Sequence, residues 1–211
     1  MKIYDLSLPL SVTDPVFPGT PGMAYEHTQL ISKDHYNLGL VHVNTHAGTH
    51  TDAPLHFIEG GTDLAAVDPG KYVGPAYVVD CTDKGAFDVI DVSDVEPHAE
   101  NIVRCRRVIF KTGWSKQFGR PEYFTDYPVI SLELARWLTE NGIVMVGVEP
   151  PSLNPALYIE VHQTLLEGGV AVVEGLTNLD CLPSQEIFFC GAPIALVEGD
   201  GFPIRALAIE F

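Results

Sequence analysis

The stretch HVNTHAGTHTDAPLHF, residues 42–57, contains four of the eight histidines in a chain of 211 residues. Residues 42, 46, 50 and 56 are all histidines at even positions, and Asp52 shares this parity. In an extended strand, residues of one parity point to the same face. The stretch therefore predicts a cluster of imidazole rings around one carboxylate.

A straight strand would keep these histidines too far apart to act together. At about 3.3 Å per residue, the Cα atoms of His46 and His50 would be separated by roughly 13 Å. Gly48 lies midway between them and can adopt the backbone angles of a bend or bulge. A helix would also bring positions four apart together, but Gly48, two threonines and Pro54 disfavour a helix. We therefore predict a kinked strand or a strand–loop junction at Gly48.

The spacing H-x-x-x-H-x-D indicates a metal site. Zn²⁺ and Mn²⁺ accept imidazole and carboxylate ligands, and His46, His50 and Asp52 supply three of them. Three protein ligands leave a coordination position for water, as in catalytic rather than structural sites. The alternative is that these histidines lie in the core and are hydrogen-bonded to one another. For a single histidine that interpretation would be preferred, but the H-x-x-x-H-x-D spacing favours a metal site.

Three further residues have open roles. His56 could exchange protons beside the ion, or it could be a fourth ligand. His162 lies on an otherwise apolar predicted helix, where a lone histidine is more often a surface or satisfied residue. Glu174 interrupts the buried-looking run VAVVEGL (residues 170–176), where a carboxylate is costly unless it is paired or metal-bound.

The composition limits the classes of partner and the location. Acidic residues number 28 against 12 basic ones, and the formal net charge of −16 repels phosphate backbones and anionic lipid. Nucleic acid and membrane surfaces are therefore not expected partners. No apolar run reaches the length of a membrane span or a signal peptide, and the four cysteines are widely spaced without a C-x-x-C pair. We expect a cytoplasmic protein.

The order of the predicted elements favours an α/β or α+β class with a mixed sheet and a few flanking helices. Strand patterns occur near residues 2–10, 76–80, 106–113, 143–149 and 170–176, and two more strands are expected around the Gly-Asp-Gly turn of the tail, residues 193–211. Helices are expected at 131–142, with Ser131 as N-cap, and at 154–169, with Asn154 as N-cap and Gly168 as terminator. Without a linker or repeat, residues 1–211 are interpreted as one domain.

The segment HAGTHTDAPLHF (residues 46–57) resembles the H-x-G-T-H-x-D-x-P-x-H-F signature of the cyclase-like metal-dependent hydrolases, a family that includes bacterial kynurenine formamidase and isatin hydrolase. The resemblance extends along the chain through FPGTP (17–21), FKTGW (110–114), VGVEPPSLNP (146–155), VHQTLL (161–166), VVEGLTNLD (172–180) and DGFPIRALA (200–208). It implies a swivelling β/β/α domain that forms homodimers or larger oligomers such as homotetramers.

The resemblance also implies site residues. His46, His50 and Asp52 would bind one Zn²⁺ or Mn²⁺ ion, and His162 and Glu174 would help to bind a second. Asp52, with Glu174, would bridge the ions in a dinuclear form. His56 would be the catalytic acid/base of an amide hydrolysis.

The resemblance implies a small aromatic substrate. The leading candidate is N-formyl-L-kynurenine, which would make the protein an arylformamidase. Phe17 stands where the formamidase pattern has a pocket-lining Trp, Thr20 replaces an Asp, and Glu149-Pro150-Pro151 replaces an Asp-containing turn. Alternatives are hydrolysis of a cyclic amide or lactone of the isatin type, a metal-dependent lyase or cyclase, and a metal-binding protein without catalysis.

Overall fold

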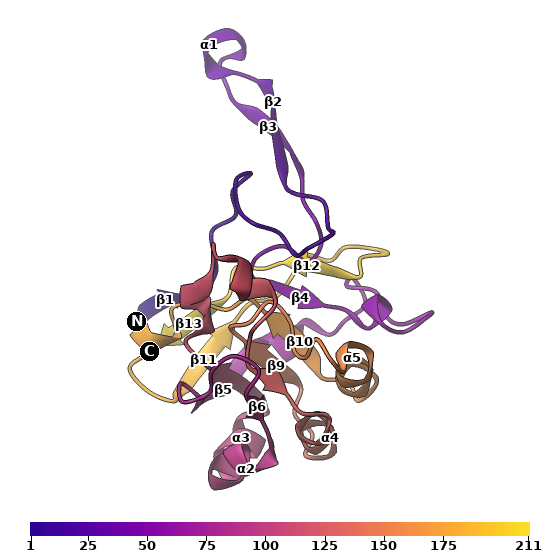
Figure 1. Ribbon diagram of the computed structural model, residues 1–211. Coiled ribbons are helices and arrows are strands. Elements are labelled where there is room, and N and C mark those ends of the chain that lie inside the picture. Colours follow the sequence, from indigo (N-terminus) through magenta and orange to yellow (C-terminus); the bar gives the residue numbers. More distant parts are fainter.

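The computed structural model describes residues 1–211 and has a large mixed sheet at its centre. Its strands are β1 (Lys2–Asp5), β4 (His50–Asp52), β5 (Val73–Asp80), β7 (Arg107–Lys111), β9 (Met145–Val148), β10 (Ala171–Glu174), β11 (Glu186–Cys190), β12 (Gly201–Pro203) and β13 (Leu207–Glu210). Their order is β1-β13-β11-β5-β7-β9-β10-β4-β12 (Figure 1). The central strands β5, β7, β9 and β10 are parallel, and all other neighbours are antiparallel. The predicted mixed α/β class is confirmed.

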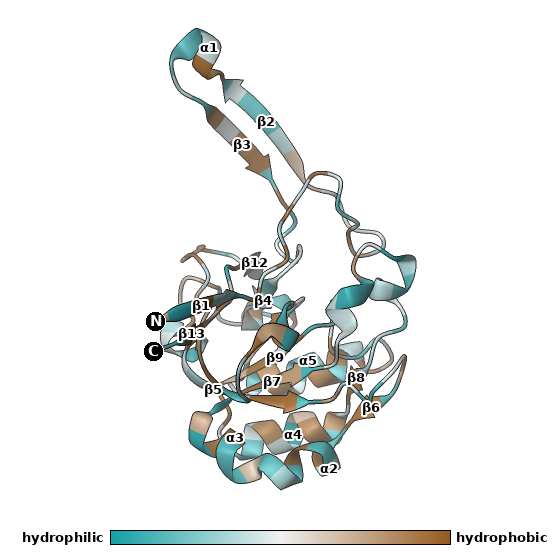
Figure 2. Ribbon diagram, turned by 90° about the vertical axis from the view of Figure 1, so that its left-hand side faces the viewer, coloured by the Kyte–Doolittle hydropathy of each residue, from teal (hydrophilic) through white to brown (hydrophobic).

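Four helices cover one face of the parallel half of the sheet: α2 (Val92–Val95), α3 (Ala99–Cys105), α4 (Leu132–Glu140) and α5 (Tyr158–Glu167) (Figures 1 and 2). Alternate strand residues face them, because side chains in a strand point to opposite faces. In β5, Tyr77 and Val79 pack against the helices, whereas Ala76 and Val78 point to the other face. None of the helices has the length and apolar character that crossing a bilayer requires.

The other face of the sheet curls around a second apolar core. Ile109, Val173 and Phe189 meet there from parallel and antiparallel strands. The chain leaving β1 completes the curl, because Ser7 forms an isolated antiparallel bridge with Leu176, just beyond β10. Strands from both ends of the chain are thereby held in one folded body.

A two-stranded arm stands clear of this body (Figures 1 and 2). It consists of β2 (Ala24–Gln29) and β3 (Leu38–His42), joined by the short helix α1 (Ile31–Asp34). A separate parallel pair, β6 (Val89–Ile90) and β8 (Val129–Ile130), lies on the helical side. The strand pattern of the sequence did not predict the arm, β6, β8 or β11.

The predicted helices are confirmed, with one corrected boundary. Ser131 caps α4 as expected, since its hydroxyl accepts a hydrogen bond from the backbone N–H of Leu134. The second helix starts at Tyr158 rather than after Asn154, whose side-chain oxygen accepts hydrogen bonds from the backbone N–H groups of residues 156 and 157 and forms a turn instead. It ends at Gly168 as predicted.

The predicted hairpin of the tail is wrong in its first strand. Residues 193–199 are irregular, and β12 and β13 both follow Asp200. Two backbone hydrogen bonds tie the irregular segment to Leu64 and Ala65 instead, from the N–H groups of those residues to the carbonyls of Gly199 and Leu196. These two carbonyls therefore accept hydrogen bonds from a loop and not from a neighbouring β-strand.

Candidate metal centre

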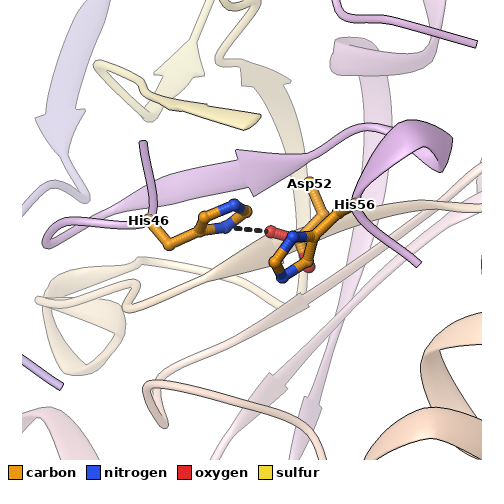
Figure 3. Close-up of side chains that lie close together, drawn as sticks. All are labelled: His46, Asp52 and His56. Atoms are coloured by element: carbon orange, nitrogen blue, oxygen red, sulfur yellow. Dashed lines mark hydrogen bonds and ion pairs between the residues drawn. The ribbon is translucent and has the colours of Figure 1, made fainter. Parts of the chain in front are cut away.

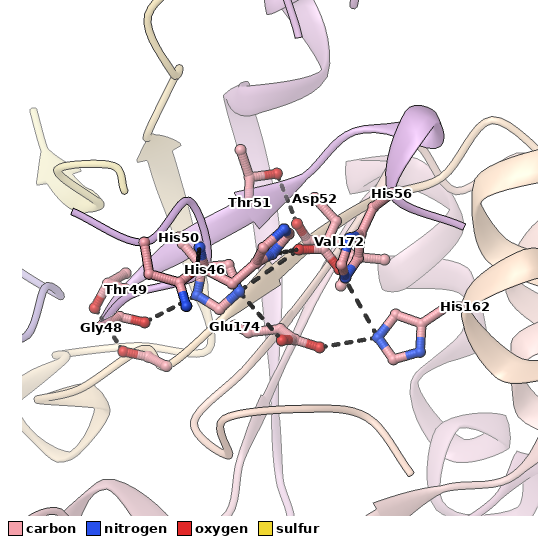
Figure 4. Close-up of polar contacts among 12 residues, drawn as sticks. His46, Gly48, Thr49, His50, Thr51, Asp52, His56, His162, Val172 and Glu174 are labelled. Carbon is pink, nitrogen blue, oxygen red and sulfur yellow. Dashed lines mark hydrogen bonds and ion pairs between the residues drawn. The ribbon is translucent and has the colours of Figure 1, made fainter. Parts of the chain in front are cut away.

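The pairing of β4 with β10 brings together ligands that lie far apart in the sequence. His50 is opposite Glu174 in the antiparallel register, and Asp52 is opposite Val172. Residues directly opposite share a face of the sheet, so His50, Asp52 and Glu174 point to the side covered by α5. His162 points to them from α5 (Figure 4).

The chain bends before β4 as predicted. Gly48 has a φ of +60°, a left-handed value that a side chain disfavours. His46 lies in the turn that precedes it, and its ring centroid is 5.1 Å from that of His50. The bend therefore replaces the roughly 13 Å spacing of a straight strand with ring contact.

Four buried side chains form the inner part of the site: His50, Asp52, His162 and Glu174, each between 1% and 4% exposed. The Nε2 atom of His50 lies 3.5 Å from Asp52 Oδ1 and 3.4 Å from Glu174 Oε2. The Nε2 atom of His162 lies 3.2 Å from Glu174 Oε1 and 3.8 Å from Asp52 Oδ2. Two carboxylates and two imidazoles thus converge, and almost none of their surface is exposed to solvent (Figure 4).

The tautomer of His50 shows that a cation fits between these groups. A carbonyl oxygen can only accept, so the 3.0 Å contact between His50 Nδ1 and the Gly48 oxygen makes Nδ1 the donor. In a neutral ring, Nε2 then carries a lone pair and faces two carboxylates; this nitrogen is buried and has no hydrogen-bond partner. His162 repeats the pattern, with Nδ1 2.7 Å from the Tyr158 carbonyl oxygen. A divalent cation satisfies lone pairs and carboxylates together.

His46 and His56 form the outer part of the site with Asp52 (Figure 3). The Nδ1 atom of His46 is 2.9 Å from Asp52 Oδ1, and its ring stacks on His56 with centroids 3.8 Å apart. The carboxylate of Asp200 lies close to both rings. Its Oδ2 atom is 3.0 Å from His46 Nε2 and 3.4 Å from His56 Nδ1. One carboxylate thus orients both rings.

The charges of the site are strongly coupled. Burial disfavours the charged form of His46, but its contacts with Asp52 and Asp200 outweigh burial and raise its pKa to about 9. Burial opposes ionisation of Asp52, yet His46, His50 and His162 hold its pKa well below the usual range. Burial lowers the pKa of His56, which favours a neutral ring near pH 7. The ionised Asp52 carboxylate is therefore balanced by positive charge, which the proton on His46 supplies and which a bound cation would replace.

All six residues expected to bind metal or exchange protons meet in this site. The geometry groups them as His46, Asp52 and His56 on one side, and His50, Asp52 and Glu174 on the other, with Asp52 common to both. His162 adjoins the second group.

The sequence reasoning missed one acidic neighbour and misplaced one histidine. Asp200 was given no role, although it stands between two glycines in the sequence. A Cβ at Gly201 would lie 2.6 Å from His46 Cε1, so this glycine leaves room for the His46 ring. His42, which shares the parity of the predicted cluster, is instead exposed at the end of β3.

A hollow with aromatic walls adjoins the metal ligands. Phe17, Phe118, Tyr123 and Phe124 line it together with His46 and His50. The rings of Phe17 and Phe124 meet edge to face, with centroids 6.0 Å apart. The predicted position of Phe17 beside the site is consistent with this lining.

The buried carboxylate of Glu149 holds the loop that supplies most of these rings. It accepts hydrogen bonds from the backbone N–H groups of Thr112 and Gly113 and from the hydroxyl of Ser115. Desolvation raises its pKa, and these donors oppose the increase. Glu149, Thr112 and Glu174 all lie at the carboxyl ends of neighbouring parallel strands, the edge where α/β sheets place their sites.

Comparison with known proteins agrees with this geometry. The Cyclase family model matches residues 4–155. The chain belongs to the Cyclase family. It is 32% identical over 212 residues to a kynurenine formamidase from Erythrobacter litoralis, covering 99% of this chain and 94% of that protein.

Solved structures of other Cyclase-like proteins share the fold. A potential metal-dependent hydrolase with cyclase activity has a TM-score of 0.80 and 28% identity, with 98% of this chain and 96% of that one covered. Isatin hydrolase A from Labrenzia aggregata has a TM-score of 0.87 at 24% identity, covering 98% and 93%, and shows the likeness of the fold alone.

Proposed function

We propose that this Cyclase family member is a metal-dependent hydrolase of aryl formamides, with N-formyl-L-kynurenine as the first candidate substrate and L-kynurenine and formate as products. One observation carries the proposal: the lone pair of His50 Nε2 faces two buried carboxylates beside a hollow with aromatic walls. The kynurenine formamidase from Erythrobacter litoralis, similar over nearly its whole length, supports the choice of substrate.

We assign the metal ligands to His46, His50, Asp52, His162 and Glu174, which would hold one or two Zn²⁺ or Mn²⁺ ions. Nitrogen and carboxylate donors suit both metals. Asp52 presents its two oxygens to different histidines and would bridge two ions. A divalent ion held here supplies Lewis-acid chemistry, polarising a carbonyl and making water more acidic.

His56 would carry the proton. Its Nδ1 lies 3.4 Å from the Asp200 carboxylate, which would favour a proton on Nδ1 and leave the lone pair on Nε2. Nε2 would accept a proton from the water that attacks the formyl carbon. It would return that proton to the aryl nitrogen as the C–N bond breaks, so that amine and formate leave.

Hydrolysis of a cyclic amide is the second candidate, favoured by the fold likeness to isatin hydrolase A. Ring opening breaks the same type of C–N bond and needs the same proton carrier. A lyase or cyclase reaction would use the same residues without net addition of water.

A substrate panel distinguishes these reactions. Metal-loaded protein is given formanilide, N-formyl-L-kynurenine, isatin and an aryl lactone, with and without chelator. We expect chelator-sensitive formate release from the two formamides at rates above those of the cyclic substrates. Turnover of isatin alone would select the second candidate, and no turnover of any compound would exclude a hydrolase of this class.

We further propose that the protein is a homodimer or homotetramer assembled through the arm. A two-stranded ribbon is marginally stable alone in water, yet Tyr25, Leu38, Leu40 and Val41 expose apolar surface on it. A second copy of the chain would cover this surface.

Light scattering after size exclusion tests the assembly. Leu40→Glu in β3 is expected to reduce the mass to that of a monomer. The control Val197→Glu, also at an exposed apolar position but away from the arm, is expected to leave the mass unchanged. A monomeric parent protein would contradict the proposal.

We also interpret residues 1–211 as one domain and the location as cytoplasmic. The pairing of β1 with β13 supports the first, and four unpaired cysteines support the second.

A further inference from the structure

No lysine or arginine lines the space around the metal ligands. The aromatic hollow and the cleft over the ligands adjoin, because they share six lining residues: Phe17, Thr20, Asn44, His46, His50 and Pro151. Neither part is lined by a lysine or an arginine. A carboxylate on the end of a substrate that points away from the metal ligands would therefore find no lysine or arginine to pair with.

Asp14 is the one acidic residue that lines the hollow without being a candidate metal ligand. It lies in the turn after Ser11, where the Ser11 backbone N–H donates to its Oδ2 atom. No lysine or arginine of the chain pairs with it, so its charge is available to the hollow. The side chain is partly buried, which weakens screening by solvent.

We propose that Asp14 sets the charge preference of the site, which selects aryl formamides with a cationic or uncharged distal group over those with an anionic one. The inference rests on the proposed function and concerns the end of the substrate opposite the formyl group. In N-formyl-L-kynurenine, the ammonium group would point to Asp14 and the carboxylate to solvent. The aromatic walls hold the ring between the two ends of the hollow.

Two analogues that differ by one group test this directly. The decarboxylated analogue, N-formylkynuramine, keeps the ammonium, whereas the deaminated analogue, 4-(2-formamidophenyl)-4-oxobutanoate, keeps only the carboxylate. We expect kcat/KM at low salt to be at least about tenfold higher for the ammonium analogue, because the Asp14 charge attracts one analogue and repels the other. The ratio should fall as salt is added.

Asp14→Asn keeps the size of the side chain and an oxygen for the Ser11 N–H, and it removes the charge. We expect it to lower the ratio between the two analogues by about tenfold. Asp83→Asn, an equal charge change in the exposed turn after β5, is the matched control and should leave the ratio unchanged. If Asp14→Asn does not fold, the salt dependence of the ratio in the native protein tests the same charge effect.

The outcomes separate the two proposals. If metal-loaded protein hydrolyses neither analogue nor formanilide, the proposed function fails. If all three are hydrolysed but the ratio is near one, or is insensitive to salt and to Asp14→Asn, the role of Asp14 is overturned while the proposed function stands.

Discussion

Among single residues, His50 gives the strongest indication of a metal site, through the orientation of its ring. Its Nδ1 atom is committed to the Gly48 carbonyl, so the other nitrogen can serve only a cation or an added proton. Gly48 provides both the bend and the carbonyl that fixes this tautomer. Gly48 therefore determines both the position of His50 and which of its ring nitrogens carries the proton in the neutral form.

Replacing His50 by Ala is expected to weaken binding of Zn²⁺ or Mn²⁺ by at least about 100-fold, because loss of a ligand exceeds the effect of losing an outer-shell partner. Metal content after dialysis measures this. His27→Ala on the exposed arm is the control and should retain full metal content. Unchanged content in His50→Ala would remove His50 from the ligand set.

His56→Ala is expected to retain the metal and lose about 10²- to 10⁴-fold in kcat, the usual contribution of a general acid–base group. Metal content and kcat are measured on the same preparation. Because His56 also lies within reach of His46 and Asp52, the two measurements together decide its role. Loss of the ion would make His56 a ligand and contradict the proton-carrier assignment.

At the scale of elements, the site depends on a pairing that sequence spacing does not reveal. His46, His50 and Asp52 lie within seven residues, so their spacing alone predicted a cluster once a bend was allowed. Glu174 reaches the site through the β4–β10 pairing, and Asp200 through the β12–β4 pairing. Such long-range pairings depend on the packing of the whole chain, so residue patterns predicted Glu174 only as a costly buried carboxylate and did not predict Asp200.

The arm was not predicted for a different reason. Sequence patterns identify elements by the residues they bury, and β2 and β3 bury almost none within the chain. The parallel strands were predictable because they bury apolar residues on both faces of the sheet, and α4 because its apolar face packs into the core on the helical side.

Glu149→Gln is expected to raise KM for formanilide by about tenfold without changing metal content. The amide oxygen of Gln can still accept from the N–H groups of Thr112 and Gly113, but these bonds lose the negative charge of the acceptor. A hydrogen bond to a charged group contributes about 1.5–3 kcal/mol, against about 0.5–1.5 kcal/mol for a neutral one. The loop that carries Phe118, Tyr123 and Phe124 would then shift. Glu133→Gln, on the exposed side of α4, is the control. An unchanged KM would show that the loop holds its position without this carboxylate.

At the scale of the whole molecule, the metal should stabilise the fold, since the ligands come from β4, β10, α5 and the segment before β4. An ion at 100 times its dissociation constant adds about 2.7 kcal/mol to the free energy of unfolding. For a chain of this length, that raises Tm by about 5–10 °C. Calorimetry with and without chelator measures the shift. Equal Tm values would indicate that no ion binds the folded site.

Hydrolysis at this site should depend on the bound ion, and a metal titration of the apo protein measures that dependence. Formate release from N-formyl-L-kynurenine is measured while Zn²⁺ or Mn²⁺ is added to chelated, dialysed protein. We expect the rate to rise with the ion bound, to level off at one or two ions per chain, and to stay at background in His50→Ala. Equal rates in metal-free and metal-loaded protein, or no formate at any loading, would contradict the account.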